Sequence, residues 1–140
     1  MAIQRTFSML KPDSIIDSNI GSIINLIEAN GFKIVALKMT KITPYLAERF
    51  YEVHRDRPFY GELVEYISSD RVVAMVLEKE NAVVDYRKLM GATDPLEAEK
   101  GTIRAQFATS KGRNAVHGSD SLENAETEAS FFFAGMDLFE

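Results

Sequence analysis

The chain has 140 residues, of which 46% are hydrophobic and 26% charged, and this composition is typical of one soluble globular domain spanning residues 1–140. It contains no cysteine, which excludes disulfides, thiolate metal sites and a cysteine nucleophile. The net charge of −5 argues against a protein whose main partner is nucleic acid, because such proteins are normally basic.

The N-terminus, from Met1 to Thr6, lacks the basic and then apolar pattern of a secretory signal peptide. The longest apolar runs, such as Val72–Leu77, are far too short to span a bilayer, so we expect no membrane association. The expected location is the cytoplasm.

The first forty residues predict two strands with a helix between them. Residues Gln4–Leu10 alternate as a strand does, and Lys11-Pro12-Asp13 stops that strand. Isoleucines at helical spacing then predict one helix over residues 14–29, which ends at Asn30-Gly31. The second strand is predicted over Phe32–Met39.

A helical insertion follows. Thr43-Pro44 is a typical helix start, with Thr43 as the cap and proline in the first turn. Arg57-Pro58 interrupts the helix, and Phe59–Ile67 predicts a second short one. The apolar stripe of the first helix is predicted to be formed by Leu46, Phe50 and Val53.

The second half of the chain begins with Val72–Leu77, a continuous apolar run that is typical of a central strand covered on both faces. Asn81–Leu89 is predicted to be a helix that ends near Gly91. The irregular segment Met90–Arg113 predicts a long loop, and a loop of this length in a compact domain is usually functional or disordered.

The last elements are short. Ala115-Val116 predicts a final strand, and Asp120 with Glu123 forms a capping-box pattern for a helix that reaches about Phe132. The resulting βαββαβ order predicts an α+β fold (α/β in the broad sense) of the ferredoxin-like type. We expect a four-stranded antiparallel sheet covered by helices on one face.

Charge is unevenly distributed along the chain. From Arg87 to Arg113 there are six Lys or Arg against three acids, whereas residues 114–140 contain six acids and no Lys or Arg. This basic stretch is either an anion site, if the fold gathers its charges, or a solvated loop with scattered charges.

The chain has two histidines, His54 and His117, and they form no metal-site signature. A lone histidine is more often structural than catalytic, but the neighbours of His117 indicate chemistry. Gly118 is expected to let a ligand approach the imidazole, and Ser119 stands where a turn enters a helix. A carboxylate such as Glu128 could fix the protonated ring nitrogen. The alternative is that Ser119-Asp120 simply caps the helix.

A neutral imidazole is a competent nucleophile toward phosphorus at pH 7. Phosphoryl transfer otherwise asks for positioning and positive charge, which Lys11, Arg87 and Arg104 could supply. The pattern of a P-loop is absent from the sequence, so a P-loop mechanism is excluded.

Several motifs resemble those of the nucleoside diphosphate kinases. The most specific is Asn114-x-x-His117-Gly118-Ser119-Asp120-Ser121, which is similar to that family's active-site signature. The resemblance runs in order from about Gln4 to Phe133 and has the character of the shorter, bacterial-type members. Further matching segments are Phe7–Asp13, Phe50–Phe59, Arg87–Pro95 and Gly101–Arg104.

The resemblance implies a ping-pong enzyme in which a nucleoside triphosphate such as ATP or GTP passes its γ-phosphoryl to His117. The phosphohistidine then donates to ADP or another nucleoside diphosphate. It also implies that Ser119 and Glu128 orient His117, that Phe59 stacks on the base, and that Mg²⁺ accompanies the nucleotide phosphates. The residues implied to contact phosphate or sugar are Lys11, Tyr51, Arg87, Thr93, Arg104 and Asn114. His54 matches a family position too, but is expected to be structural or peripheral.

The resemblance further implies a homo-oligomer, either a tetramer or a hexamer. Phe131-Phe132-Phe133 and Phe139 could bury against a neighbouring subunit or finish the core of the chain itself. One departure from the family pattern lies opposite the stacked base. The family often has a small apolar residue there, whereas this chain has Lys111, whose stem could still cover the base.

Two rival functions remain open at this point. A non-catalytic ferredoxin-like domain could hold nucleotide for regulation. Binding of nucleic acid could accompany or replace catalysis, although the net charge counts against it as the main function.

Overall fold

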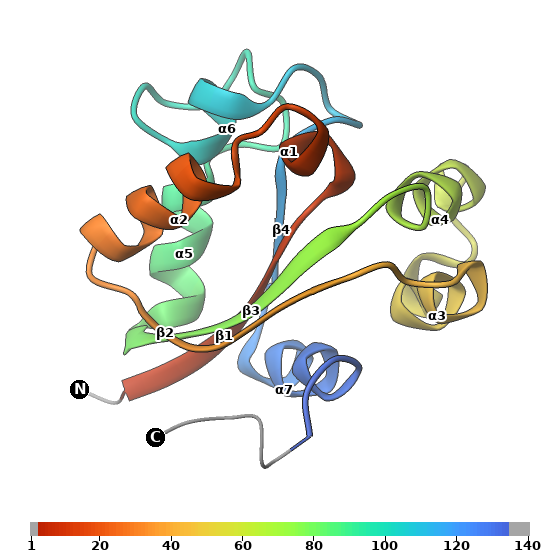
Figure 1. Cartoon of the computed structure of the whole chain (residues 1–140), viewed down its shortest axis with the longest axis horizontal. Helices are drawn as coiled ribbons and strands as arrows, with labels where there is room; N and C mark the ends of the chain where they lie inside the picture. The colour runs from red at the N-terminus through yellow and green to blue at the C-terminus, as the bar shows by residue number, and fades with distance from the viewer. Residues whose placement is uncertain (1–2, 135–140) are drawn as a thin grey trace.

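The computed structural model describes residues 3–134, and these are arranged around one four-stranded sheet (Figure 1). The sheet has the strand order β2-β3-β1-β4, and every pairing in it is antiparallel. This arrangement confirms the predicted ferredoxin-like α+β class. The strands are β1 (Ile3–Leu10), β2 (Lys33–Thr40), β3 (Val72–Glu80) and β4 (Val116–Gly118).

Helices cover both faces of the sheet, so the expectation of helices on one face is wrong. In Figure 1, α2 and α5 lie on one side, while α3, α4 and α7 lie on the other. The cause is the continuous apolar run of β3, because alternate residues of a strand point to opposite faces. Val73, Met75 and Leu77 join one core, and Val72, Ala74 and Val76 join the other. The helices are α1 (Pro12–Ile16), α2 (Ile20–Ala29), α3 (Pro44–Phe50), α4 (Tyr60–Ile67), α5 (Ala82–Met90), α6 (Ile103–Phe107) and α7 (Leu122–Ser130).

The helix predicted over residues 14–29 is two helices, α1 and α2. They are separated by Asp17–Asn19, where Ser18 has a φ of +60°. A left-handed residue cannot continue a right-handed helix, and the three polar side chains there favour a turn. The isoleucine periodicity holds only for α2, in which Ile23 and Ile27 are fully buried.

The helical insertion, called the hairpin below, comprises α3, a 3₁₀ turn over Glu52–His54 and α4. The Oγ1 of Thr43 accepts a hydrogen bond from the backbone N–H of Leu46 at 3.2 Å, as the cap prediction requires. The prediction that Val53 belongs to the apolar stripe is wrong. The α-helix ends at Phe50, and the 3₁₀ turn leaves Val53 81% exposed.

Two further elements differ from expectation. The segment predicted as a loop contains α6, which is capped by Thr102 through a 3.3 Å bond from the backbone N–H of Ala105. The cap of α7 is Ser121 and not Asp120, since the Ser121 Oγ accepts from the backbone N–H of Asn124 at 3.0 Å.

The segment after α7 belongs to the core of the chain itself. Phe132 and Phe133 are buried in the core that also contains Phe7 and Phe50, and the ring of Phe132 stacks on Phe7 at 5.3 Å between centroids. Phe139 lies outside the described residues.

Candidate active site

His117 lies in the middle of β4, the short edge strand that pairs with β1. It is directly opposite Met9, so its side chain is on the face of the sheet that holds Phe7 and Met9. The ring is enclosed by Phe50 at 5.3 Å, Tyr51 at 6.1 Å and Phe7 at 6.2 Å between centroids. The imidazole is therefore half-buried within an aromatic wall.

Gly118 serves packing on the opposite face. A Cβ atom at this position would lie 2.6 Å from the Cε of Met90 and 2.9 Å from the Cδ2 of Tyr86, both on α5. The expectation that Gly118 opens space for a ligand beside the imidazole is therefore wrong. The glycine allows α5 to approach the strand that carries the histidine.

The His117 ring is hydrogen-bonded to Glu128 on α7. The distance from His117 Nε2 to Glu128 Oε1 is 3.0 Å, and the Ser119 Oγ donates to the same carboxylate oxygen at 2.6 Å. When Nε2 carries the ring proton and donates to the carboxylate, Nδ1 keeps its lone pair. This arrangement is suited to a nucleophilic imidazole.

Tyr51 is buried beside the histidine. Burial, and secondarily the negative charge of Glu128, raise the pKa of the Tyr51 phenol. The hydroxyl therefore stays protonated at neutral pH and can donate a hydrogen bond to an anion.

Lys11 and Asn114 meet at the other end of β4. Lys11 is only 6% exposed, and its ammonium donates to the Asn114 Oδ1 at 2.9 Å. Burial lowers the pKa of Lys11 to about 8; the nearby Asp13 acts against this shift and Arg104 adds to it. The site thus holds a buried cation with few protein partners, which an anionic ligand would stabilise.

Arg104 on α6 ties three parts of the site together. Its guanidinium donates to the carbonyl oxygens of Gly91 at 3.0 Å, Asn114 at 3.2 Å and Val116 at 2.9 Å. These bonds use three of the five N–H donors of arginine and leave two for a ligand. Burial, and to a smaller extent the charge of Arg87, lower the pKa of Arg104, while Tyr86 acts against this shift.

A cavity of about 370 Å³ lies between the end of α5, the following loop and α6. It brings together Arg87, Thr93 and Arg104, the predicted phosphate-contacting residues of the basic stretch. His117, Lys11, Tyr51 and Phe59 are not part of its lining. The predicted site residues therefore form two groups, one around the His117 ring and one around this cavity. Arg104 belongs to both, because it lines the cavity and bonds to the backbone of Asn114 and Val116.

Phe59 lies at the start of α4 and is 48% exposed. Its ring is 5.9 Å from that of His54, which is in turn 6.1 Å from that of Tyr51. His54, expected to be structural or peripheral, thus links the predicted base-stacking ring to the aromatic wall. Lys111 is exposed. It lies in a tight turn that is closed by a hydrogen bond from the backbone N–H of Thr109 to the backbone carbonyl of Arg113.

Three residues that the sequence did not indicate hold the segment before His117. Asp13 and Ser14 bond to the backbone of Ala115, and Tyr66 bonds to Asp13. Asp13 is separated from Ala115 by 102 residues, and its place in the segment Phe7–Asp13 indicates a strand stop and a family match but no role for its side chain. No local pattern could have found this contact.

Among residues 3–134, no three His, Cys, Asp or Glu side chains gather as metal ligands would. In the same part of the chain, no helix has the length and apolarity needed to cross a membrane.

Comparison with known proteins covers nearly the whole chain. Residues 4–138 match the family model of nucleoside diphosphate kinase. The nucleoside diphosphate kinase of Flavobacterium psychrophilum is 56% identical over 139 residues, which make up 99% of this chain and 100% of that protein. The Aquifex aeolicus enzyme aligns with a TM-score of 0.95 at 48% identity, covering 98% of this chain and 99% of that one. The Halobacterium salinarum enzyme, solved in complex with CDP, has a TM-score of 0.94 at 40% identity, covering 99% of this chain and 93% of that one. The resemblance seen in the motifs is thereby confirmed.

Proposed function

Because the chain belongs to the nucleoside diphosphate kinase family and is therefore a phosphotransferase, we propose that His117 carries the phosphoryl group between nucleotides. The observation that carries this proposal is the 3.0 Å contact between His117 Nε2 and Glu128. A ring held in this way presents the Nδ1 lone pair as the nucleophile. The rival of a non-catalytic nucleotide-binding domain is not favoured, since the relatives are named as enzymes.

The proposed reaction has two halves. In the first, the Nδ1 lone pair attacks the γ-phosphorus of a nucleoside triphosphate, the bond to the bridging oxygen breaks, and the nucleoside diphosphate leaves with the electron pair. In the second, an oxygen on the terminal phosphate of another nucleoside diphosphate attacks the phosphorus, and the electron pair of the P–N bond returns to Nδ1. Ser119 and Glu128 keep the ring oriented through both halves.

Positive charge and hydrogen-bond donors support both halves, because phosphoryl transfer depends mainly on positioning and electrostatics. Lys11 supplies a charge beside β4, and Arg104, which bonds to the carbonyl of Val116 on β4, keeps two unused N–H donors. The further residues proposed to contact phosphate or sugar are Tyr51, Arg87, Thr93 and Asn114.

We propose that Phe59 stacks on the base of either nucleotide. Its half-exposed ring is backed by His54, and an aromatic face accepts any base without hydrogen-bond readout. The stem of Lys111 would cover the other side of the base, which accommodates ATP, GTP, ADP and other nucleotides alike.

Each nucleotide is proposed to bind as its Mg²⁺ complex. Mg²⁺ prefers phosphate oxygens and retained waters, so no protein side chain is proposed to hold it. When bound, Mg²⁺ neutralises part of the phosphate charge. The chain's own contribution is to place Lys11 and Arg104 around the transferred group.

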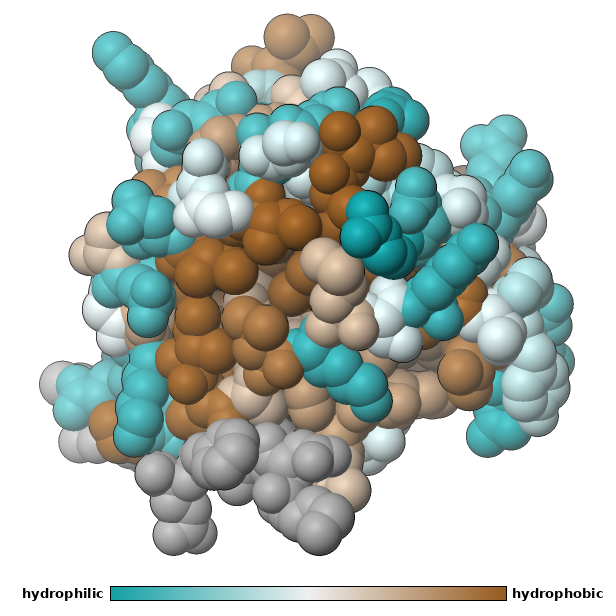
Figure 2. All heavy atoms as spheres, in the orientation of Figure 1, coloured by the Kyte–Doolittle hydropathy of each residue, from teal (hydrophilic) through white to brown (hydrophobic). Residues whose placement is uncertain are grey.

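A homo-oligomer, tetramer or hexamer, is also proposed, with the cytoplasm as its location. Figure 2 shows apolar side chains gathered over α2 and the edge strand β2. Leu37 and Met39 on β2 are 50% and 45% exposed, and Ile20 and Ile24 of α2 are only partly buried. An exposed apolar patch beside an open strand edge is typical of a subunit interface.

The test uses the two histidines of the chain. The protein is incubated with γ-labelled ATP and Mg²⁺ without an acceptor, and acid-labile, alkali-stable label is measured. Wild type should take up label and release it to ADP, and His117→Ala should take up none. His54→Gln is the matched control and should still be labelled. Equal labelling of His117→Ala, or none in wild type, contradicts the proposal.

A further inference from the structure

The peptide before His117 is held in a strained turn. Ala115 has a φ of +73°, and the backbone N–H of Val116 donates to the carbonyl of Asn114 at 2.8 Å, which closes a three-residue γ-turn around Ala115. A non-glycine residue with positive φ persists only where its surroundings hold it. Asn114 and His117 lie on either side of this turn, so its geometry decides where both side chains point.

The first turn of α1 holds Ala115 by both of its peptide groups. The Asp13 Oδ2 accepts from the backbone N–H of Ala115 at 2.9 Å. The Ala115 carbonyl accepts from the backbone N–H of Lys11 at 2.9 Å and from the Ser14 Oγ at 2.8 Å. Asp13 is 1% exposed and Ala115 is fully buried, so water is not available to replace these bonds.

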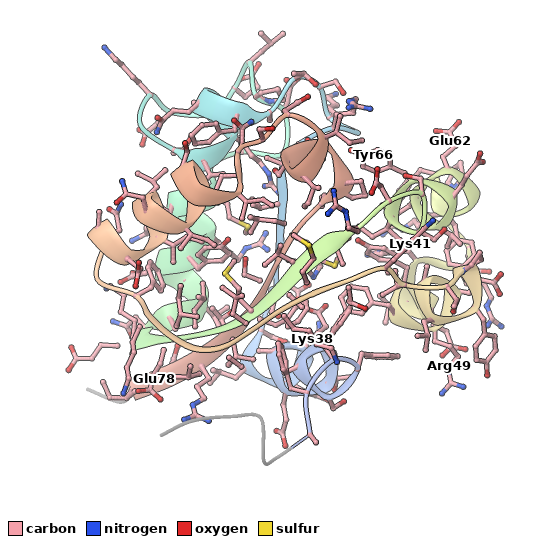
Figure 3. All side chains as sticks on the ribbon, viewed as in Figure 1. Lys38, Lys41, Arg49, Glu62, Tyr66 and Glu78 are labelled. Carbon is pink, nitrogen blue, oxygen red and sulfur yellow. The ribbon has the colours of Figure 1, made fainter. Side chains whose placement is uncertain are left out.

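The second carboxylate oxygen of Asp13 binds the hairpin. The Tyr66 hydroxyl donates to the Asp13 Oδ1 at 2.7 Å and accepts from the backbone N–H of Asp13 at 2.9 Å. Tyr66 belongs to α4, and Figure 3 shows it reaching from that helix towards α1. The Arg113 guanidinium lies over the same ring, 5.7 Å from its centroid.

We propose that Asp13 is a positioning residue for phosphoryl transfer, which fixes the Ala115 turn with one oxygen and anchors the hairpin through Tyr66 with the other. The inference rests on the proposed role of His117. One carboxylate then sets the geometry of Asn114 and His117 and that of the helix that begins beside Phe59. Asp13 acts through these groups, and touches neither nucleotide nor phosphorus.

The charge of Asp13 has a second effect. It is the negative group that keeps Lys11 protonated, against burial and against the positive charge of Arg104, and so it raises the pKa of Lys11. Burial and the bond to Asp13 raise the pKa of Tyr66, so the phenol stays a hydrogen-bond donor over the pH range in which Lys11 titrates. Replacing the carboxylate by an amide should therefore lower the pKa of Lys11, so that Lys11 loses its proton at a lower pH.

The experiment measures the rate of label transfer from γ-labelled ATP to His117 in rapid-quench mixing, against pH and ATP concentration. Asp13→Asn keeps an acceptor for Ala115 and removes the charge; Asp13→Ala removes both; Tyr66→Phe cuts only the link to α4. Asp17→Asn, an exposed carboxylate four residues away, and the exposed Tyr45→Phe are the matched controls. Thermal melting is recorded for every variant.

Asp13→Ala should slow labelling at saturating ATP by about tenfold or more, as misplacement of reacting groups does, while the ATP concentration for half-saturation changes less than the rate. Asp13→Asn should recover part of the rate. The fall of its labelling rate at alkaline pH, which reflects the loss of the Lys11 proton, should begin at a lower pH than in wild type. Tyr66→Phe should slow labelling less than Asp13→Ala, and both controls should match wild type.

The proposal is overturned if Asp13→Asn and Tyr66→Phe melt earlier but label at the wild-type rate with an unshifted pH limb, since Asp13 is then structural only. These two variants decide the matter even where Asp13→Ala does not fold. Absence of label in wild type contradicts the role of His117 itself, so the two failures are distinguishable.

Discussion

Lys11 is a proposed phosphate contact whose charge depends strongly on its surroundings. Its ammonium is buried, has a pKa near 8 and bonds to Asn114. Below that pKa it is charged and can attract a phosphate; above it the neutral amine cannot. Lys11 should therefore lose its positive charge just above physiological pH when no nucleotide is bound.

We expect kcat/KM to fall as the pH rises through about 8, because that parameter reports the titration of the free enzyme. Lys11→Arg should have lower activity but no such alkaline limb, since arginine stays charged. The measurement is the pH profile of kcat/KM with ADP as acceptor. An identical alkaline limb in Lys11→Arg would assign it to another group.

Gly118→Ala should destabilise the protein by about 1–3 kcal/mol, because the new methyl group meets Met90 and Tyr86. Gly112→Ala is the matched control, as nothing lies within 4 Å of its added Cβ. Denaturant unfolding of the two variants checks this. Equal stability of both would mean that α5 moves aside freely.

Among the elements, α7 carries Glu128, whose carboxylate bonds to the ring of His117, the proposed nucleophile. Its first turn is fixed by the side chain of Ser121, and its position on the sheet by packing against β1. Fraying of this helix would loosen the carboxylate that holds the imidazole.

Ser121→Ala should cost about 1 kcal/mol of unfolding free energy through loss of the cap. It should also lower the rate of His117 labelling, whereas Asp120→Ala should cost less because Asp120 bonds to no backbone N–H of the helix. Chemical denaturation and labelling rates of both variants test this. A larger loss in Asp120→Ala would move the cap back to the residue that the sequence suggested.

The elements also show what sequence patterns can predict. The apolar run Val72–Leu77 is long and continuous, so the central strand was found, and Thr43 marked α3 correctly. The break at Ser18 was missed because the spacing from Ile16 to Ile20 is helical in the sequence, although Ile16 is exposed in the structure. The helix α6 was missed because five residues carry too little periodicity. The contact between Asp13 and Ala115 was missed because it is purely tertiary, whereas the His117 motif is local and was recognised from its residues.

At the scale of the whole molecule, the sheet buries apolar residues on both faces but leaves the β2 edge open. The patch formed by Leu37, Met39, Ile20 and Ile24 lies beside that edge. Two copies joined there would bury apolar area that a single copy leaves in water.

Leu37→Glu should reduce the mass of the assembly in light scattering, because it places a charge in the proposed interface. Val84→Glu, on the exposed side of α5, is the matched control and should keep the wild-type mass. Circular dichroism verifies that both variants are folded. Dissociation by Val84→Glu alone would place the interface on α5.

The position of β1 has a consequence for protein synthesis. This strand is synthesised before β3 and β4, yet it pairs with both of them. Phe132, which stacks on Phe7, follows later still. The pairing that places His117 beside β1 therefore cannot form until β4 has been synthesised, and a polypeptide that ends before Phe132 lacks two of the buried rings of the core around Phe7. The proposed activity therefore depends on segments from both ends of the described chain.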